Sequence, residues 1–144
     1  MLSERFGWGV QDELQELIAQ RPMKELLVGE SLVLRTGDEK VPWLISVPTM
    51  RVPMRLRQTV NPYLAMKALL IAVKSHVMNP PIETVAIPGF GTGCGHLDPV
   101  TAVSQMRKAF DEIHCEQFSF PQHFNEAQRR HIDLNPNEIN IWEE

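Results

Sequence analysis

The feature that most constrains this chain is a run of alternating glycines, Gly89-Phe90-Gly91-Thr92-Gly93-Cys94-Gly95. An apolar, β-branched run at residues 83–87 precedes it and predicts a buried strand. Asp98 and Pro99 follow it and predict a helix start, because aspartate caps helices and proline suits their first turn. A strand, a glycine loop and a helix N-terminus in that order predict an anion site, since main-chain N–H groups can approach a phosphate closely where Cβ atoms are missing.

Glycines in a strand-to-helix connection also occur only to make a tight turn, without any ligand. Four glycines in seven residues are more than a turn requires, and this favours ligand binding. The dinucleotide fingerprint is not met, because the position of its third glycine holds Cys94 or His96, and no Walker-type Gly-Lys-Ser/Thr follows. The loop has no lysine or arginine, so main-chain amides would carry the recognition. That suits a diphosphate bridge better than a transferring γ-phosphate.

Composition sets the broad class of the protein. The 144 residues, with 43% hydrophobic and 22% charged side chains, predict one domain over residues 1–144, with a core at 9–113 and a C-terminal extension at 116–144. The net charge of −4 argues against nucleic-acid and membrane partners. Two cysteines give no disulfide framework, and no apolar stretch approaches membrane-spanning length, so we expect a cytoplasmic protein without a cofactor.

Hydrophobic periodicity predicts helices over residues 9–20, 61–75, 98–113 and 124–134, and strands over 26–35, 43–47 and 83–87. Residues 118–120 are a candidate edge strand, and residues 134–142 are expected to be irregular and to pack back on the body. This order predicts an α/β sheet covered on both sides. The first helix has Val10, Leu14, Leu17 and Ile18 on one face, and the second is expected to turn Leu64, Ala68, Ile71 and Ala72 inward. The apolar residues at helical spacing in the third are Val103, Met106, Phe110 and Ile113.

Other groups with chemical potential carry weaker signals. The arginines at 51, 55 and 57 form either a solvated loop face, which we favour, or a rim that draws in a phosphorylated ligand. Cys94 is expected to be a small loop residue rather than a nucleophile. His96 and Asp98 form either an acid/base pair or a loop histidine beside a capping aspartate, and we favour the latter. Histidine and cysteine spacings do not match a zinc site, so no metal is expected.

With these residues placed, the stretch from Leu26 to about Ile113 resembles a bacterial or phage branch of the macro domain family. The closest parts are Val47–Pro53, the helix after Asn61, and Ala86–Gly93. The resemblance implies a three-layer α/β/α sandwich with a mixed, mostly parallel sheet, and ADP-ribose as the ligand. It also implies that the diphosphate and distal ribose contact a loop made of Pro88, Gly89, Phe90, Gly91, Thr92, Gly93, Cys94 and Gly95. Phe90 and Thr92 would be its variable side-chain contacts.

The chain departs from the family pattern at its front. Macro domains normally open with a strand, a loop bearing paired asparagines and a first glycine-rich loop, whereas the first asparagine here is Asn61, expected to be a helix cap. We therefore expect an N-terminally shortened or replaced fold, with an exposed sheet edge that favours self-association. Catalytic residues stay unassigned, because neither the asparagines nor an obvious base for water is present.

These observations predict a domain that binds ADP-ribose or a related phosphorylated nucleotide metabolite through the glycine loop. Weak hydrolysis of ADP-ribosyl esters, as in O-acetyl-ADP-ribose deacetylation, is the enzymatic version of this hypothesis. The alternative hypothesis is a degenerate fold that serves as a structural or protein-interaction module, with the loop as a relic.

Overall fold

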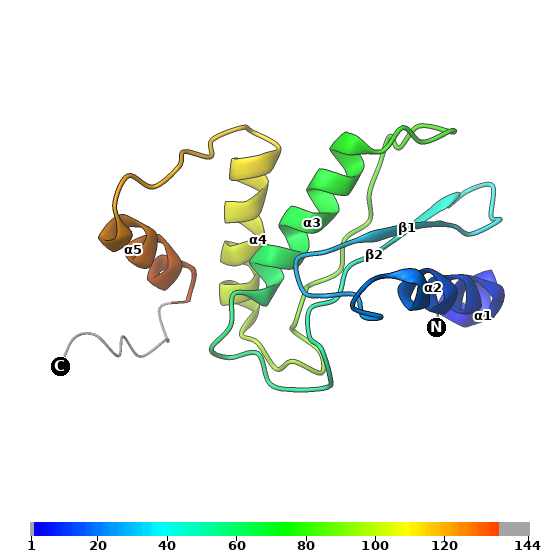
Figure 1. Cartoon of the computed structure of the whole chain (residues 1–144), viewed down its shortest axis with the longest axis horizontal. Coiled ribbons are helices and arrows are strands. Elements are labelled where there is room, and N and C mark those ends of the chain that lie inside the picture. Colours follow the sequence, from blue (N-terminus) through cyan, green and yellow to red (C-terminus); the bar gives the residue numbers. More distant parts are fainter. Residues whose placement is uncertain (1, 136–144) are drawn as a thin grey trace.

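The computed structural model describes residues 2–135, with side chains from residue 4 onward. Its helices are α1 (Leu2–Phe6), α2 (Gly9–Gln20), α3 (Asn61–Ser75), α4 (Pro99–Ile113) and α5 (Phe124–Leu134), and its strands are β1 (Leu32–Arg35) and β2 (Trp43–Ser46). Figure 1 shows the β1–β2 hairpin between α2 and α3, with α4 crossing α3 and α5 set to one side. The predicted packing of residues 136–142 lies outside the described residues.

The four predicted helices lie where the hydrophobic pattern predicts them. In α2, the predicted apolar face is also the partly buried one. The side chains of α2 that are half-buried are the four predicted ones, Val10, Leu14, Leu17 and Ile18. In α3, Ala68 and Ala72 are buried as expected, whereas Ile71 is 50% exposed. In α4, Met106, Phe110 and Ile113 are half-buried against the core, whereas Val103 is 63% exposed. The buried residues of α4 are Ala102, Gln105, Ala109 and Glu112. Alanines allow α3 and α4 to approach closely, so a weakly apolar face is the packed one.

The start of α3 corrects a second expectation. Asn61 is not the helix cap: Val60 precedes the helix, and no side chain caps it. The Nδ2 atom of Asn61 donates instead to the carbonyl oxygen of Thr49, at 2.8 Å. Asn61 therefore ties the N-terminus of α3 to the segment that follows β2. Of the two tryptophans in this half of the chain, Trp8 is 66% exposed, whereas Trp43 is half-buried on β2.

The sheet formed by the described residues is smaller than predicted. It has two antiparallel strands, with Leu32 opposite Ser46 and Arg35 opposite Trp43. The expected long strand at 26–35 is confirmed only at its end, because Gly29 has φ of +95° in a turn that closes with the Glu30 amide on the Leu27 carbonyl, at 3.0 Å. Residues 118–120 form no strand and are exposed.

The predicted strand at residues 83–87 joins no ladder among the described residues. Val85 and Ile87 are half-buried against the core, whereas Thr84 and Ala86 are exposed, so burial on one face holds the segment without strand partners. Its upstream end is tied to the hairpin by the Trp43 Nε1 atom, which donates to the Pro80 carbonyl at 2.8 Å. A mostly parallel three-layer sandwich is therefore not confirmed by residues 2–135.

Two groups of buried side chains make up the core. The larger one joins α3, α4 and the segment before the glycine loop through Ala65, Met66, Leu69, Leu70, Phe90 and Ala109. The smaller one consists of Leu56, Leu97 and Ala102, with Met50 packed against it. This smaller cluster lies directly under the glycine loop and the loop that precedes α3, and it fixes the position of both.

Candidate functional site

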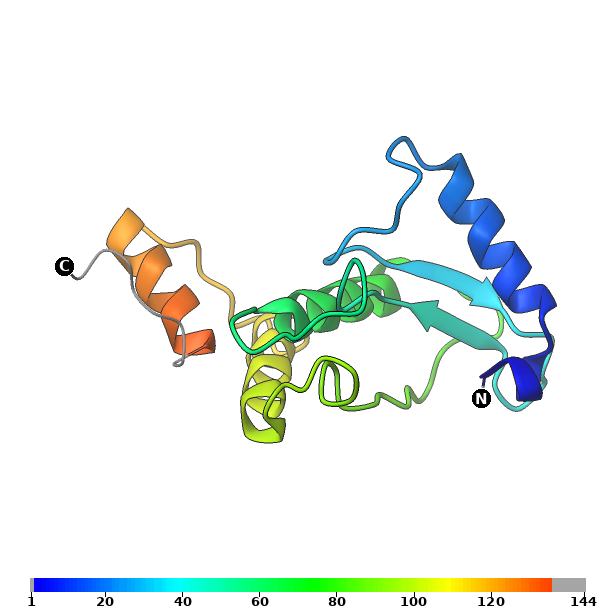
Figure 2. The same ribbon diagram turned by 90° about the horizontal axis from the view of Figure 1, so that it is seen from below.

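A cleft of about 1110 Å³ lies between the loop at residues 54–59 and the segment at residues 92–101. Figures 1 and 2 show that both segments lie near the N-termini of α3 and α4. The lining includes side chains from both: Met54, Arg55, Arg57, Gln58, Thr59, Thr92, His96, Leu97, Asp98, Pro99 and Thr101. The cleft therefore opens where the sequence predicts an anion site, and a second loop supplies its other wall.

The two walls are joined by a close main-chain contact. The amide of Leu56 donates to the carbonyl oxygen of Gly95 at 2.8 Å, and the Leu56 side chain is 0% exposed beneath the loop. A Cβ atom on Gly95 would lie 2.6 Å from the carbonyl oxygen of Gly91 and 2.8 Å from Leu56 Cδ1. Only glycine fits there, so the residue at 95 is explained by packing between the loops.

The glycine loop holds its shape through its own main chain. The amides of Leu97 and His96 donate to the carbonyls of Gly91 and Gly93, each at 3.0 Å. Gly91 has φ of +77° and His96 has φ of +49°, so the chain turns in the left-handed region at both ends of the segment between them. Within residues 2–135, the amides of Gly93, Cys94 and Gly95 donate no hydrogen bond, which leaves three successive N–H groups for another acceptor.

The residues predicted from the loop sequence take different environments. Pro88, Gly89, Gly93 and Cys94 are exposed, Gly91 and Thr92 are half-buried, and Gly95 is buried. Thr92 lines the cleft, and its Oγ1 atom donates to the Gly89 carbonyl at 2.9 Å. The expectation that Phe90 contacts a ligand with its side chain is not met, because its ring is 7% exposed and packs in the larger core group. The ring anchors the loop and does not line the cleft.

Asp98 caps α4, as predicted. Its Oδ2 atom accepts from the Thr101 amide at 2.9 Å and from the Thr101 hydroxyl at 3.2 Å. No hydrogen bond joins Asp98 to His96 among the described residues, so the loop histidine beside a capping aspartate is the arrangement present. The carboxylate also places negative charge at the N-terminus of α4. This charge offsets the positive end of the helix dipole, which would otherwise attract an anion.

Arg55 and Arg57 are the site residues whose role the sequence left open. Both line the cleft, whereas Arg51 points to an ion pair in which its Nε atom lies 2.7 Å from Glu25 Oε1. The guanidinium groups of Arg55 and Arg57 form no ion pair or hydrogen bond with the residues described between 4 and 135. The signal in the sequence is the alternation Arg55-Leu56-Arg57, in which a buried leucine stands between two exposed arginines.

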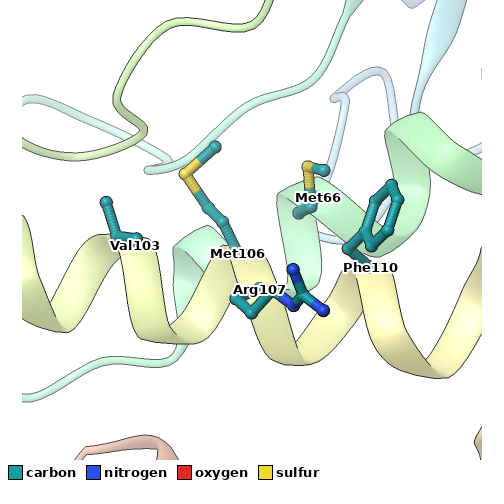
Figure 3. A pocket seen from close by; sticks show the side chains of 5 residues that line it. All are labelled: Met66, Val103, Met106, Arg107 and Phe110. Atoms are coloured by element: carbon teal, nitrogen blue, oxygen red, sulfur yellow. The ribbon is translucent and has the colours of Figure 1, made fainter.

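A second hollow, of about 300 Å³, lies on the outer side of α3 and α4. Figure 3 shows the Met66 side chain from α3 between those of Met106 and Phe110 from α4, with Val103 and Arg107 completing the lining. Arg107 is paired with Asp111, with Nε and Oδ1 at 2.8 Å. Apart from this ion-paired arginine, the lining is apolar and offers no donors to a diphosphate. Among the described residues, no group of three or more histidine, cysteine or acidic side chains could hold a metal ion.

A partly buried polar cluster joins α3 to α4, and none of its members lines the cleft. The Tyr63 hydroxyl donates to Glu112 Oε2 at 2.6 Å, and Lys67 Nζ lies 3.1 Å from the same oxygen. Burial alone would raise the pKa of Glu112, but the hydrogen bonds from Tyr63 and Lys67 and the nearby lysine charges outweigh it and lower this pKa. Burial opposes the charge of Lys67 in the same way, and its contacts with Tyr63 and Glu112 raise its pKa. This cluster is structural.

The comparisons with known proteins identify a family. The family model described as the Macro domain matches residues 1–106, from the first helix to the middle of α4. No curated protein and no solved structure matches the chain. Among the described residues, no helix combines the length and the apolar character that crossing a bilayer requires.

Proposed function

This chain belongs to the macro domain family, whose members have an α/β fold and generally bind ADP-ribose, and on that premise we propose which part of it binds the ligand. The proposed ligand is ADP-ribose or a closely related phosphorylated nucleotide metabolite. Its diphosphate lies on the main-chain amides of the loop Pro88–Gly95. Pro88 has no N–H group and donates none of these hydrogen bonds. The distal ribose then lies in the cleft beside Thr92 and His96.

The observation that carries this proposal is the run of free amides at Gly93, Cys94 and Gly95. Successive main-chain N–H groups beside a left-handed residue form a concave donor surface that suits phosphate oxygens. Gly93 and Cys94 are exposed, and no protein atom lies within 4 Å of the place where a Cβ on Gly93 would be. A diphosphate can therefore approach this part of the loop without displacing a side chain.

The size of the cleft agrees with a ligand larger than a single phosphate. Small-molecule sites usually enclose about 300–1,000 Å³, and this cleft of about 1110 Å³ is slightly larger than that range. Its mixed lining of arginines, threonines and a histidine suits a polar nucleotide. Binding without efficient turnover is the version we favour, because Asp98 is committed to capping α4 and no other carboxylate lines the cleft among the residues that the structure describes. Hydrolysis of ADP-ribosyl esters and self-association through a sheet edge stay predictions.

Calorimetric titration with ADP-ribose tests the proposal, using the Gly93→Val variant. A Cβ atom at this position meets no protein atom within 4 Å, and the backbone is not left-handed, so the melting temperature should change little. Its side chain would occupy the approach to the free amides and should abolish binding. The matched control is Gly9→Val at the start of α2, which is equally open and lies in no proposed site.

A folded wild-type protein that gives no heat with ADP-ribose at high concentration would contradict the proposal. The interaction-module hypothesis would then replace it. Gly91 is a poor choice for this test, because its φ is +77° and a Cβ atom there would lie 3.0 Å from Leu56 Cδ1, so any side chain is disruptive. A loss of binding at Gly91 would not separate ligand contact from misfolding.

A further inference from the structure

We infer that Arg55 and Arg57 form the cationic wall of the cleft and bind the phosphate groups of the ligand that the glycine loop holds. The inference rests on the proposed function for the identity of the nucleotide. It adds that two arginine side chains, together with the main-chain amides, recognise the phosphate groups. A chain of net charge −4 would then attract a polyanion through two specific side chains.

The first support is the difference between the arginines of one short loop. Arg51 is paired with Glu25 outside the cleft, whereas Arg55 and Arg57 line the cleft and their guanidinium groups have no partner among the described residues. A guanidinium group presents five N–H donors in a planar fork that matches phosphate oxygens. Two unpaired guanidinium groups in a cleft that Thr92 and His96, on either side of the free amides, also line are therefore suited to a diphosphate.

The second support is the charge of the opposite wall. Asp98 lies in the same cleft and caps α4 with its carboxylate, so the helix N-terminus contributes little net positive potential. Neutral amides of the loop provide hydrogen bonds but no full positive charge. Arg55 and Arg57 thus supply the charge that a diphosphate requires and that the rest of the lining lacks.

The third support is that the loop bearing these arginines is held in place on three sides. The main-chain amide of Leu56 donates a hydrogen bond to the carbonyl oxygen of Gly95. Gln105 Nε2, from α4, donates to the Thr59 carbonyl at 2.9 Å, and Asn135 Nδ2, at the end of α5, donates to the Arg57 carbonyl at 3.2 Å. Both side chains are fully buried. A fixed main chain reduces the entropy lost when the arginines bind, because only their side chains need to be ordered.

The test is titration calorimetry with two probes, ADP-ribose and inorganic pyrophosphate, at low and high salt. We expect the variant R55Q/R57Q to weaken binding of both probes by about tenfold or more at low salt. The difference from wild type should shrink at high salt, because exposed charges are screened. Arg51→Gln is the matched control, since it removes an arginine of the same loop that lies outside the cleft, and it should bind within about twofold of wild type. Both substituted arginines are exposed, so the melting temperature should be unchanged.

The outcomes separate this inference from the proposed function. If wild type binds ADP-ribose and R55Q/R57Q binds it equally well, the inference is overturned and the proposed function stands. If wild type binds pyrophosphate through the two arginines but does not bind ADP-ribose, the inference is supported and the proposed function is overturned. A wild-type protein that binds neither probe overturns both.

Discussion

The main-chain amide of Leu56 lies 2.8 Å from the carbonyl oxygen of Gly95, and this hydrogen bond joins two loops that are far apart in the sequence. One loop carries free amides and the other carries free arginines. The contact needs a buried leucine on one side and the absence of a side chain on the other. The geometry of the candidate site therefore depends on this pair as much as on the residues that line the cleft.

Gly95→Ala should destabilise the protein and loosen the cleft. The new methyl group would lie 2.6 Å from the Gly91 carbonyl oxygen, and that atom belongs to the main chain and cannot rotate away. We expect a loss of about 1–3 kcal/mol in the free energy of unfolding, measured with urea. Gly93→Ala provides the comparison, because its Cβ meets no atom within 4 Å. Equal stability of the two variants would contradict the packing described for this contact.

Asp98→Asn should strengthen binding of ADP-ribose at low salt by a few-fold. Asparagine caps helices about as well as aspartate, so α4 should keep its stability. The substitution removes a negative charge from the cleft without removing the acceptor for the Thr101 amide. Asp98→Ala should instead cost about 1 kcal/mol of stability, because the cap is lost. Weaker binding by Asp98→Asn, with unchanged unfolding, would show that the carboxylate contacts the ligand directly.

Glu112→Gln should lower the free energy of unfolding by about 1–3 kcal/mol at neutral pH, because Lys67 loses its charged partner inside the α3–α4 contact. The pKa of Glu112 is lowered in the folded protein, after burial and the opposing hydrogen bonds from Tyr63 and Lys67 are combined. Its stabilising contribution is therefore present above the unfolded-state pKa of about 4.3 and is lost as the pH falls through the lower folded value.

The raised pKa of Lys67 acts at the other end of the pH range. Burial lowers this pKa and the contacts with Tyr63 and Glu112 raise it by more, so the contribution of Lys67 is full below about 10.4 and is lost as the pH rises through the folded value. Urea unfolding of wild type and Glu112→Gln should show a constant difference between about pH 5 and pH 9 and a smaller one near pH 3. A difference that grows on acidification would contradict the cluster.

Val103→Ser and Ala109→Leu test the orientation of α4. Val103 is 63% exposed, so serine should change the free energy of unfolding by less than about 0.5 kcal/mol. Ala109 is 0% exposed between the helices, and leucine should cost about 1–3 kcal/mol through overpacking. Thermal melts of the two variants give the comparison. The opposite order would restore the face that hydrophobicity alone predicts.

Local chemistry explains why some of the structure was predictable. The bounds of α3 and α4 follow from Pro62, from Asp98-Pro99 and from helical apolar spacing, which are short-range signals. In α4, the apolar residues Met106, Phe110 and Ile113 lie against the core, but Val103 is exposed and the less hydrophobic Ala102 is buried, a difference that helical spacing does not predict. The strand at 83–87 was predicted from composition, but a strand also needs a neighbour with which to share hydrogen bonds, and residues 2–135 provide none.

The same division holds for the candidate site. The sequence by itself determined that a glycine loop precedes a capped helix, because glycine frequency and the Asp98-Pro99 pair act within a few residues. Only the tertiary structure decided that Phe90 anchors the loop, that Gly95 admits Leu56, and that Arg55 and Arg57 face the loop across a cleft. These relations depend on chain segments about 40 residues apart meeting in space, and burial and close packing choose such partners without leaving a local pattern.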